Sequence, residues 1–283
     1  MFDQLKILTL YLTFHLKKRF QPPPTPRPSA TILLVRDGAD HLEVFMVVRH
    51  RKIDFASGAL VFPGGKVDPQ DKLPNMRQFC DGADELSDEA LSLRIAAIRE
   101  TFEECGILLA RADGEPQLID AERVNRLASY RDALNKRSGS MQELVTKENL
   151  RLACDQCHHF SHWVTPEMVA KRYDTHFFLV EAPGDQVGQH DGHESVDSLW
   201  INPKAALDEA KEGKHLIVFP TRLNLEKLGE NQAVSQAIDQ VKHAAIHEVL
   251  PTMVWQGMDI YLTLPESAGY GKVMEPLKKL MTP

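Results

Sequence analysis

The stretch RETFEECGI, residues 99–107, decides how the rest of this chain is interpreted. On a helix at 100° per residue, Glu100, Glu103 and Glu104 fall within an arc of about 100°. Like charges at these spacings repel by a few tenths of a kcal/mol per pair, so folding alone does not favour them. A divalent cation would supply positive charge, and carboxylate oxygens suit Mg²⁺ or Mn²⁺. A solvated acidic helix face is the alternative, and Gly106, which would end the polar part of the helix, argues against it.

Length and composition limit the classes of protein to consider. The 283 residues carry 33 Lys and Arg against 40 Asp and Glu, a formal charge of −7, and 43% are hydrophobic. These values are typical of a folded globular protein and exclude collagen-like and wholly disordered chains. The acidic balance argues against a protein that coats nucleic acid, because such binding draws on clustered Lys and Arg. A small nucleotide-type substrate remains compatible with it.

The four cysteines bear on the cellular compartment and on one alternative function. They are too few for a disulfide framework, so we expect a reducing, cytoplasmic environment. Cys154, Cys157 and His158 match the C-x-x-C-H pattern of covalent haem attachment. Leu150 and Ala153 precede the two thiols at helical spacing, however. We therefore interpret Cys154 and Cys157 as small apolar residues on a buried helix face.

The N-terminal part, residues 1–27, differs in composition from the rest. About 15 mostly apolar residues are followed by three basic ones, which is too short and too interrupted for a membrane span of about 20 residues. We expect an amphipathic helix that packs on the body or on a second copy in a homo-oligomer, or that makes peripheral membrane contact. The Pro-rich stretch at residues 21–28 is a stiff spacer, so a second domain is expected over residues 28–283.

From residue 29 onward, strands and helices alternate along the chain. Apolar runs at residues 30–37 and 42–50 predict a β-hairpin. Further strands are expected within residues 58–65, 175–182 and 196–201. Helices are expected over residues 88–109, over 121–160 in two or three pieces, from Asn202-Pro203 onward and over 232–249. This order predicts an α/β or α+β fold class with a mixed sheet.

The spacing of the charged residues resembles the signature of the Nudix hydrolases. That signature reads Gly, five residues, Glu, seven residues, then Arg-Glu-apolar-any-Glu-Glu-any-Gly-apolar. Gly65 matches the first glycine, Asp71 stands where the first Glu belongs, and residues 99–107 match the second half with one polar exception. Twenty-seven residues follow Asp71 where seven are usual. Since a surface loop lengthens at small entropic cost, we expect residues 72–90 to be a loop that keeps its two ends together.

The resemblance implies a fold, a metal and a set of site residues. The fold would be an α/β/α sandwich around a mixed sheet, with insertions at residues 72–90 and about 112–165. The reaction would be the Mg²⁺- or Mn²⁺-dependent hydrolysis of a diphosphate linked to a larger group. The implied metal ligands are the carboxylates of Glu100, Glu103 and Glu104 and the backbone carbonyl of Gly65. Glu100 would serve a second ion or the activated water, and Arg99 would hold a helix carboxylate in a charge-assisted pair.

The resemblance allows the general base to lie on the same helix or on a distant loop, and the candidate substrate contacts lie outside the helix. Glu194, at the end of the loop QHDGHE, is a candidate base, and an ordinary flexible loop is the alternative. Arg49, Arg51 and Gly64 are candidate substrate contacts, because an arginine beside the sheet can meet a substrate phosphate. Arginines at a sheet edge also commonly face solvent.

A wider set of motifs resembles the peroxisomal coenzyme A diphosphatases and their bacterial relatives. It includes FPGG at 62–65, WVTP at 163–166 and FPT at 219–221, whereas Asp54 occupies the place of an arginine. The expected substrate is coenzyme A or acyl-CoA, with ADP-ribose, NADH and dinucleoside polyphosphates as alternatives. A Nudix-fold ligand-binding regulator without turnover is the alternative from another class. No nucleic-acid partner is expected, and residues 281–283 do not form a peroxisomal address.

Overall fold

The computed structural model describes residues 22–50, 57–192 and 195–277, which fall into two compact units. The large unit consists of Pro28–Phe160 and His176–Ala245. Its described counterpart, the small unit, holds residues 22–27, 161–175 and 246–277. The domain limits expected from the sequence stay a prediction.

The large unit is built on a mainly antiparallel sheet. In sheet order, the strands that lie wholly or partly in this unit are β7 (His158–Val164), β8 (Tyr173–Glu181), β1 (Arg27–Asp37), β2 (Leu42–Arg49) and β3 (Leu60–Val61). β1 and β2 form the expected hairpin, with Val35 opposite Val44. β4 (Gly64–Lys66) pairs with β1, and β9 (Ser195–Ile201) pairs with β2. The short β4 therefore places a glycine pair beside the central strand.

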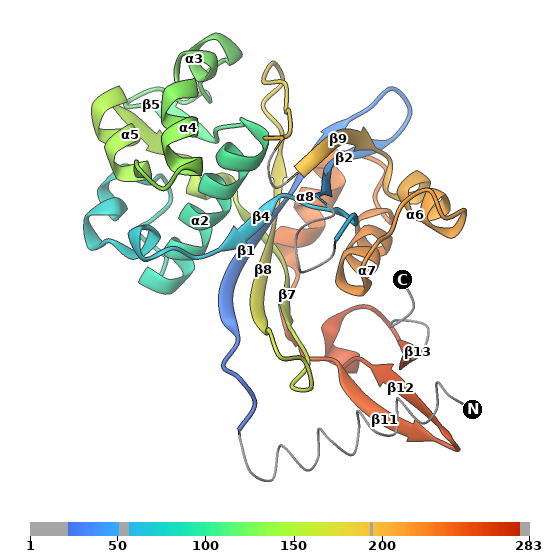
Figure 1. The fold of residues 1–283 in the computed structure, drawn as a ribbon. Helices are drawn as coiled ribbons and strands as arrows, with labels where there is room; N and C mark the ends of the chain where they lie inside the picture. Colours follow the sequence, from blue (N-terminus) through green and yellow to red (C-terminus); the bar gives the residue numbers. More distant parts are fainter. Residues whose placement is uncertain (1–21, 51–56, 193–194, 278–283) are drawn as a thin grey trace. The chain divides into compact units, whose positions relative to one another are not determined.

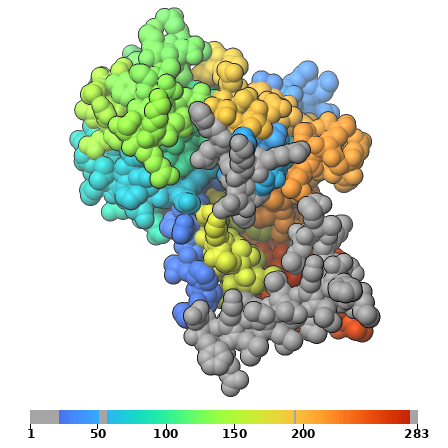
Figure 2. Space-filling view, viewed as in Figure 1, coloured from blue at the N-terminus to red at the C-terminus, as the bar shows by residue number. Residues whose placement is uncertain are grey.

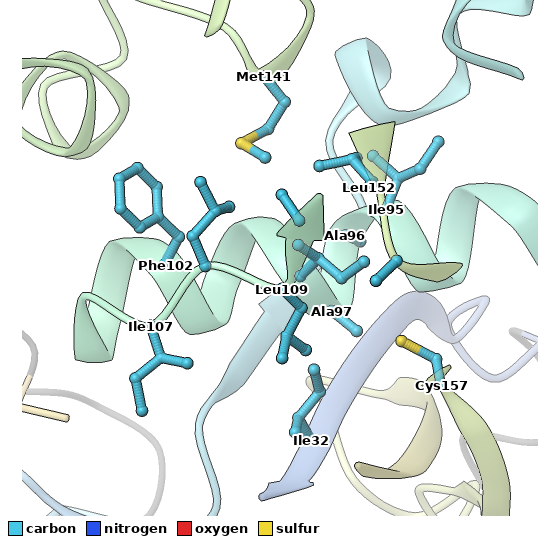
Figure 3. Packing of buried hydrophobic residues seen from close by; sticks show 14 of the residues in the cluster. Ile32, Ile95, Ala96, Ala97, Phe102, Ile107, Leu109, Met141, Leu152 and Cys157 are labelled. Carbon is cyan, nitrogen blue, oxygen red and sulfur yellow. The ribbon is translucent and has the colours of Figure 1, made fainter. Parts of the chain in front are cut away.

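Helix α2 (Asp88–Cys105) covers one face of this sheet (Figure 1). The Ser87 side chain accepts a hydrogen bond from the Ala90 amide at 3.1 Å and caps its first turn. Gly106, in the left-handed region with φ 70°, ends it. The apolar face of α2 is buried, and Figure 3 shows Ile95 and Phe102 in the same core as Ile32 of β1. The polar face of its last turns is left to the three glutamates.

Three helices of the same unit lie on the other side of the sheet in Figure 1: α6 (Pro203–Lys211), α7 (Phe219–Leu228) and α8 (Val234–His243). Asn202 caps α6, and its side chain accepts from the amides of the first turn, as the sequence predicts. The helix expected over residues 232–249 is shorter, because α8 ends at His243 and a strand follows. Along β1, consecutive side chains from Ile32 to Val35 are fully buried, so both faces of the strand are covered.

The segment between Asp71 and α2 has more structure than the expected loop. Two 3-10 helices, labelled η, occur here: η1 (Pro69–Lys72) contains Asp71, and η2 (Pro74–Phe79) follows it. Helix α2 then begins within the range 72–90. Asp81 accepts from Arg111 at 2.8 Å and from Arg151 at 2.5 Å. These ion pairs attach the segment to the two-stranded sheet of β5 (Ala110–Ala112) and β6 (Leu150–Leu152). The longer connection is therefore anchored along its length.

The second insertion adds α3 (Ala121–Arg126), α4 (Ala128–Asn135) and α5 (Met141–Glu148). Figure 2 shows these green segments together with the cyan ones on one side of the unit. The prediction of a continuous helical stretch through Cys154 and Cys157 is wrong, because only one 3-10 turn is found there. Asn149, with φ 51°, ends α5, and the chain then forms β6, η3 (Cys154–Gln156) and β7. Both thiols are nonetheless buried, as expected of apolar core residues.

The small unit contains the remaining parts of β1, β7 and β8 and a separate three-stranded antiparallel sheet. Its further elements are β10 (Glu248–Val249), β11 (Thr252–Gln256), β12 (Asp259–Thr263), η4 (Glu266–Ala268) and β13 (Met274–Pro276). β10 extends the main sheet by pairing in parallel with β7. The main sheet is therefore mixed, and the α/β fold class is confirmed. Across the described ranges, no helix combines the length and the apolarity that crossing a membrane requires.

Candidate active site

The glycine pair of β4 lies directly against the carboxylates of α2. The Gly64 amide donates a hydrogen bond to Glu104 Oε2 at 3.1 Å. A Cβ added at Gly65 would lie 2.4 Å from the carboxyl carbon of Glu100, closer than any side chain can approach. With Glu100 in this position, a side chain at residue 65 would collide with its carboxyl group, so only glycine fits there. The expectation that the long insertion leaves this glycine beside the helix is confirmed.

Arg99 joins the site to the chain on either side of the insertion. Its Nε donates to Asp71 Oδ1 at 2.9 Å, and its Nη2 donates to Asp71 Oδ2 at 2.9 Å and to the Lys66 carbonyl at 2.9 Å. Its Nη1 donates to Glu100 at 2.9 Å and to Glu103 at 3.1 Å. One guanidinium thus orients two of the three helix carboxylates, as a planar five-donor group can.

Burial makes the Arg99–Asp71 pair a fixed part of the fold. The two side chains are 5% and 0% exposed. Burial lowers the pKa of Arg99, but the bond to Asp71 and the nearby carboxylates raise it further, so its pKa lies above the ordinary value. For Asp71, burial raises the pKa by more than Arg99 lowers it. The guanidinium therefore remains charged at any pH at which the protein is folded.

Asp71 occupies the position of the first Glu of the signature, and its contacts define what it does. Besides Arg99, its Oδ2 accepts the Asp68 amide at 2.8 Å, which closes the capping box of η1. Both carboxylate oxygens are thus engaged by the protein itself. Asp71 acts here as the anchor of Arg99, across the 27 residues that separate them.

The candidate site residues divide into three groups. Those that the structure brings together are Gly64, Gly65, Arg99, Glu100, Glu103 and Glu104. Arg49 lies at the end of β2, opposite Ser195 of β9, and its amide donates to the Ala59 carbonyl at 3.0 Å. Arg51 and Glu194 lie outside the described residues, as does Asp54. The roles of all these residues stay predictions.

The donor set of this site fits a hard divalent cation. Glu100 and Glu103 have side chains 14% and 15% exposed, and Glu104 is buried. Carboxylate and carbonyl oxygens are the ligands that Mg²⁺ and Mn²⁺ prefer. The residues that would hold such an ion are Glu100, Glu103, Glu104 and the Gly65 carbonyl.

Sequence reasoning missed the residues that fix the C-terminal end of α2. Arg131 and Asn135 of α4 donate to its last carbonyls, and Gln189 of the loop before β9 does so through its backbone amide. A weak signal was present, because the last turn of α2 contains no basic residue of its own. The partner that supplies the positive charge is 27 to 28 residues away, so only the fold identifies it.

A helix-flanked mixed sheet, with a glycine pair set against a glutamate-rich helix, defines a hydrolase of the Nudix class. A family model described as the NUDT19 Nudix domain matches residues 74–228, more than half of the chain, and the chain belongs to the Nudix family. The resemblance seen in the sequence is thereby confirmed. The matched range begins after Gly65 and Asp71, but both residues contact the matched helix α2 in the fold.

Curated relatives and a solved structure agree with this assignment. The putative nudix hydrolase 7 of Caenorhabditis elegans is 28% identical over 187 residues, which cover 66% of this chain and 56% of that protein. The acyl-coenzyme A diphosphatase NUDT19 of Xenopus laevis is 24% identical over 225 residues, or 66% of this chain and 59% of that protein. The match thus spans less than two thirds of each relative. A NUDIX hydrolase from Alicyclobacillus acidocaldarius has a TM-score of 0.63 and 27% identity over 76% of this chain and 96% of its own.

Proposed function

We propose that this Nudix hydrolase cleaves the diphosphate bond of coenzyme A or acyl-CoA with the help of Mg²⁺ or Mn²⁺. The observation that carries the metal-dependent part is the contact of Gly64 and Gly65 with Glu104 and Glu100. The substrate part is supported by the relatives that are named acyl-coenzyme A diphosphatases. The FPGG run at 62–65 supports it from the sequence.

Each helix carboxylate is held in place by a named group. Glu104 is oriented by the Gly64 amide, and Glu100 and Glu103 are oriented by Arg99. Divalent ions bound to these oxygens would neutralise the diphosphate and lower the pKa of the attacking water. Preorganised ligands reduce the cost of arranging this charge during the reaction.

The remaining roles belong to residues outside the helix. A carboxylate at Glu194 would accept the proton of the attacking water, as a general base of the loop. The Arg49 guanidinium, at the end of β2, would pair with a phosphate of the substrate. Neither role is needed for the metal site itself.

A product assay tests the proposal directly. Purified protein is incubated with coenzyme A or acyl-CoA and with Mg²⁺ or Mn²⁺, and the mixture is separated by chromatography. The expected products are 3′-phospho-AMP and 4′-phosphopantetheine or its acyl form. Parallel reactions contain ADP-ribose, NADH and a dinucleoside polyphosphate, and Glu104→Gln is the inactive control.

Each outcome separates one candidate from the others. Rapid cleavage of another substrate, with neither expected product formed from coenzyme A, would support a metal-dependent hydrolase but refute coenzyme A as its substrate. Binding of a nucleotide without any phosphate-bond cleavage would support the regulator without turnover instead.

A further inference from the structure

We propose that Arg131, on the insertion helix α4, is a positioning residue that holds the metal-binding turn of α2 and the neighbouring loop at Gln189. The inference rests on the proposed metal-dependent function of α2. It gives the second insertion a role in the site, although none of its helices carries a residue of the Nudix signature.

The last turn of α2 concentrates negative charge, and the turn itself contains no basic residue. The C-terminal end of a helix carries a partial negative charge, which disfavours acidic side chains nearby. Glu103 and Glu104 are in this last turn, which has no basic residue of its own, although Arg99 one turn earlier pairs with Glu103. A positive charge at the carbonyl end of the helix would stabilise the turn further.

Arg131 places a positive charge at this helix end by donating to its carbonyls. Its Nε donates to the Glu103 carbonyl and its Nη2 to the Glu104 carbonyl, both at 3.0 Å. Asn135, one turn later on α4, donates to the Glu103 carbonyl at 3.3 Å. Since these carbonyls belong to the metal-binding glutamates themselves, Arg131 fixes the backbone from which both side chains extend.

The remaining two carbonyls of the turn are satisfied as well. The Gly106 amide donates to the Phe102 carbonyl at 2.9 Å, and the Gln189 amide donates to the Cys105 carbonyl at 2.9 Å. A helix leaves its last four carbonyls without partners of its own. Here all four have one, and Arg131 provides two of the bonds.

Arg131 also reaches the loop that precedes β9. Its Nη2 donates to the Gln189 carbonyl at 3.0 Å, so the Gln189 backbone is bound on both sides. The buried Gln186 fixes the same loop, because its side chain bonds to the amide and carbonyl of Leu108. The loop is thus attached to the C-terminal end of α2 at Gln189.

Gly106 shows how closely the guanidinium approaches the helix end. A Cβ at Gly106 would lie 2.8 Å from Arg131 Nη1, and the φ of 70° disfavours a side chain there in any case. Two features of the structure therefore favour glycine at position 106. It ends the helix, and it leaves space for Arg131.

A matched control exists within the same insertion. Arg123 of α3 is also half-buried, and its Nη2 donates to the Glu148 carbonyl at the end of α5, at 2.8 Å. It thus makes the same kind of contact at a helix that carries none of the candidate metal ligands. Arg123→Ala reports what the loss of such a contact does to stability alone.

The experiment compares full-length wild type with Arg131→Ala, Arg131→Lys and Arg123→Ala. Mn²⁺ binding is measured by electron paramagnetic resonance without substrate, and hydrolysis is measured over a range of Mg²⁺ concentrations. For Arg131→Ala we expect at least about a fivefold rise in both the Mn²⁺ dissociation constant and the half-activating Mg²⁺ concentration, equivalent to about 1 kcal/mol. Excess metal should recover part of the turnover. The lysine variant should lie between, because one ammonium cannot match the planar fork of arginine.

The control decides between positioning and general stability. Arg123→Ala should lower the unfolding temperature and leave both metal constants within about twofold of wild type. Equal metal constants in the alanine variants of Arg131 and Arg123 would overturn the inference. If Arg131→Ala does not fold, Arg131→Lys is compared with Arg123→Ala in the same way.

The test also separates this inference from the proposed function. Wild type that binds Mn²⁺ through Glu104 but hydrolyses no substrate would refute the function, while the Mn²⁺ comparison would still decide the role of Arg131. Wild type that binds no Mn²⁺ would overturn both.

Discussion

Asp71→Asn tests whether Asp71 anchors Arg99 or serves as a metal ligand. The substitution keeps the size of the side chain and removes its charge. Arg99 donates to both Asp71 oxygens at 2.9 Å, and the two side chains are 5% and 0% exposed. An asparagine offers one acceptor oxygen, so its amide group would face an Arg99 N–H. One charge-assisted bond is lost, and a buried donor is left without an acceptor.

The expected cost follows from the partners that Arg99 keeps. Removing one partner of a buried ion pair costs about 3–5 kcal/mol when the remaining charge has no other contact. Arg99 retains Glu100, Glu103 and the Lys66 carbonyl. We therefore expect a loss of about 2–4 kcal/mol, somewhat below that range, since a lost hydrogen bond to a charged group is worth about 1.5–3 kcal/mol.

Urea and thermal unfolding measure this loss, and a metal titration measures the other possibility. At about 2–4 °C per kcal/mol, the unfolding temperature should fall by roughly 5–15 °C. Below that temperature the half-activating Mg²⁺ concentration should change by less than about threefold, because Arg99 still holds Glu100 and Glu103. An unchanged free energy of unfolding together with a lost response to metal would refute the anchoring role and make Asp71 a ligand.

Three further expectations concern the helix, the N-terminus and the thiols. Glu103→Gln and Glu104→Gln should each lower turnover by at least about 10² with the fold retained, because each removes a charged ligand; near-normal rates in both would contradict the site. Deleting residues 1–27 should leave hydrolysis intact and change vesicle binding or sedimentation instead, and a truncated chain that cannot fold would refute this boundary. All four cysteines are buried, and burial raises the pKa of the Cys157 thiol from 9.0 to about 12, so the native protein should not react with a thiol reagent at pH 8, whereas the unfolded chain should. The pKa of Cys157 is higher in the folded than in the unfolded chain, so its contribution to the free energy of unfolding should be complete below pH 9. Between pH 9 and about pH 12 this contribution should fall by about 1.4 kcal/mol per pH unit. Constant urea midpoints across that range would contradict it.

Several elements could be read from local sequence because neighbouring residues decide them. The β1–β2 hairpin follows from two apolar runs and a short polar turn, and Asn202 begins α6 by capping its first turn. The same local logic failed after Asn149, where apolar residues at helical spacing predicted a helix. Pairing of β6 with β5 determines that segment instead, and a strand partner about 40 residues away leaves no mark on local periodicity.

The sequence by itself determined the carboxylate face of α2, since the spacing of Glu100, Glu103 and Glu104 on a helix fixes their common side. It also determined the family, through the residues of the signature. Only the tertiary structure decided how these glutamates are held. The Gly64 amide meets Glu104 across 40 positions of the chain, and Arg131 meets the carbonyls of the same turn from a separate helix. Such contacts depend on how the insertions pack against α2, and packing between distant segments is set by the whole core rather than by any local pattern.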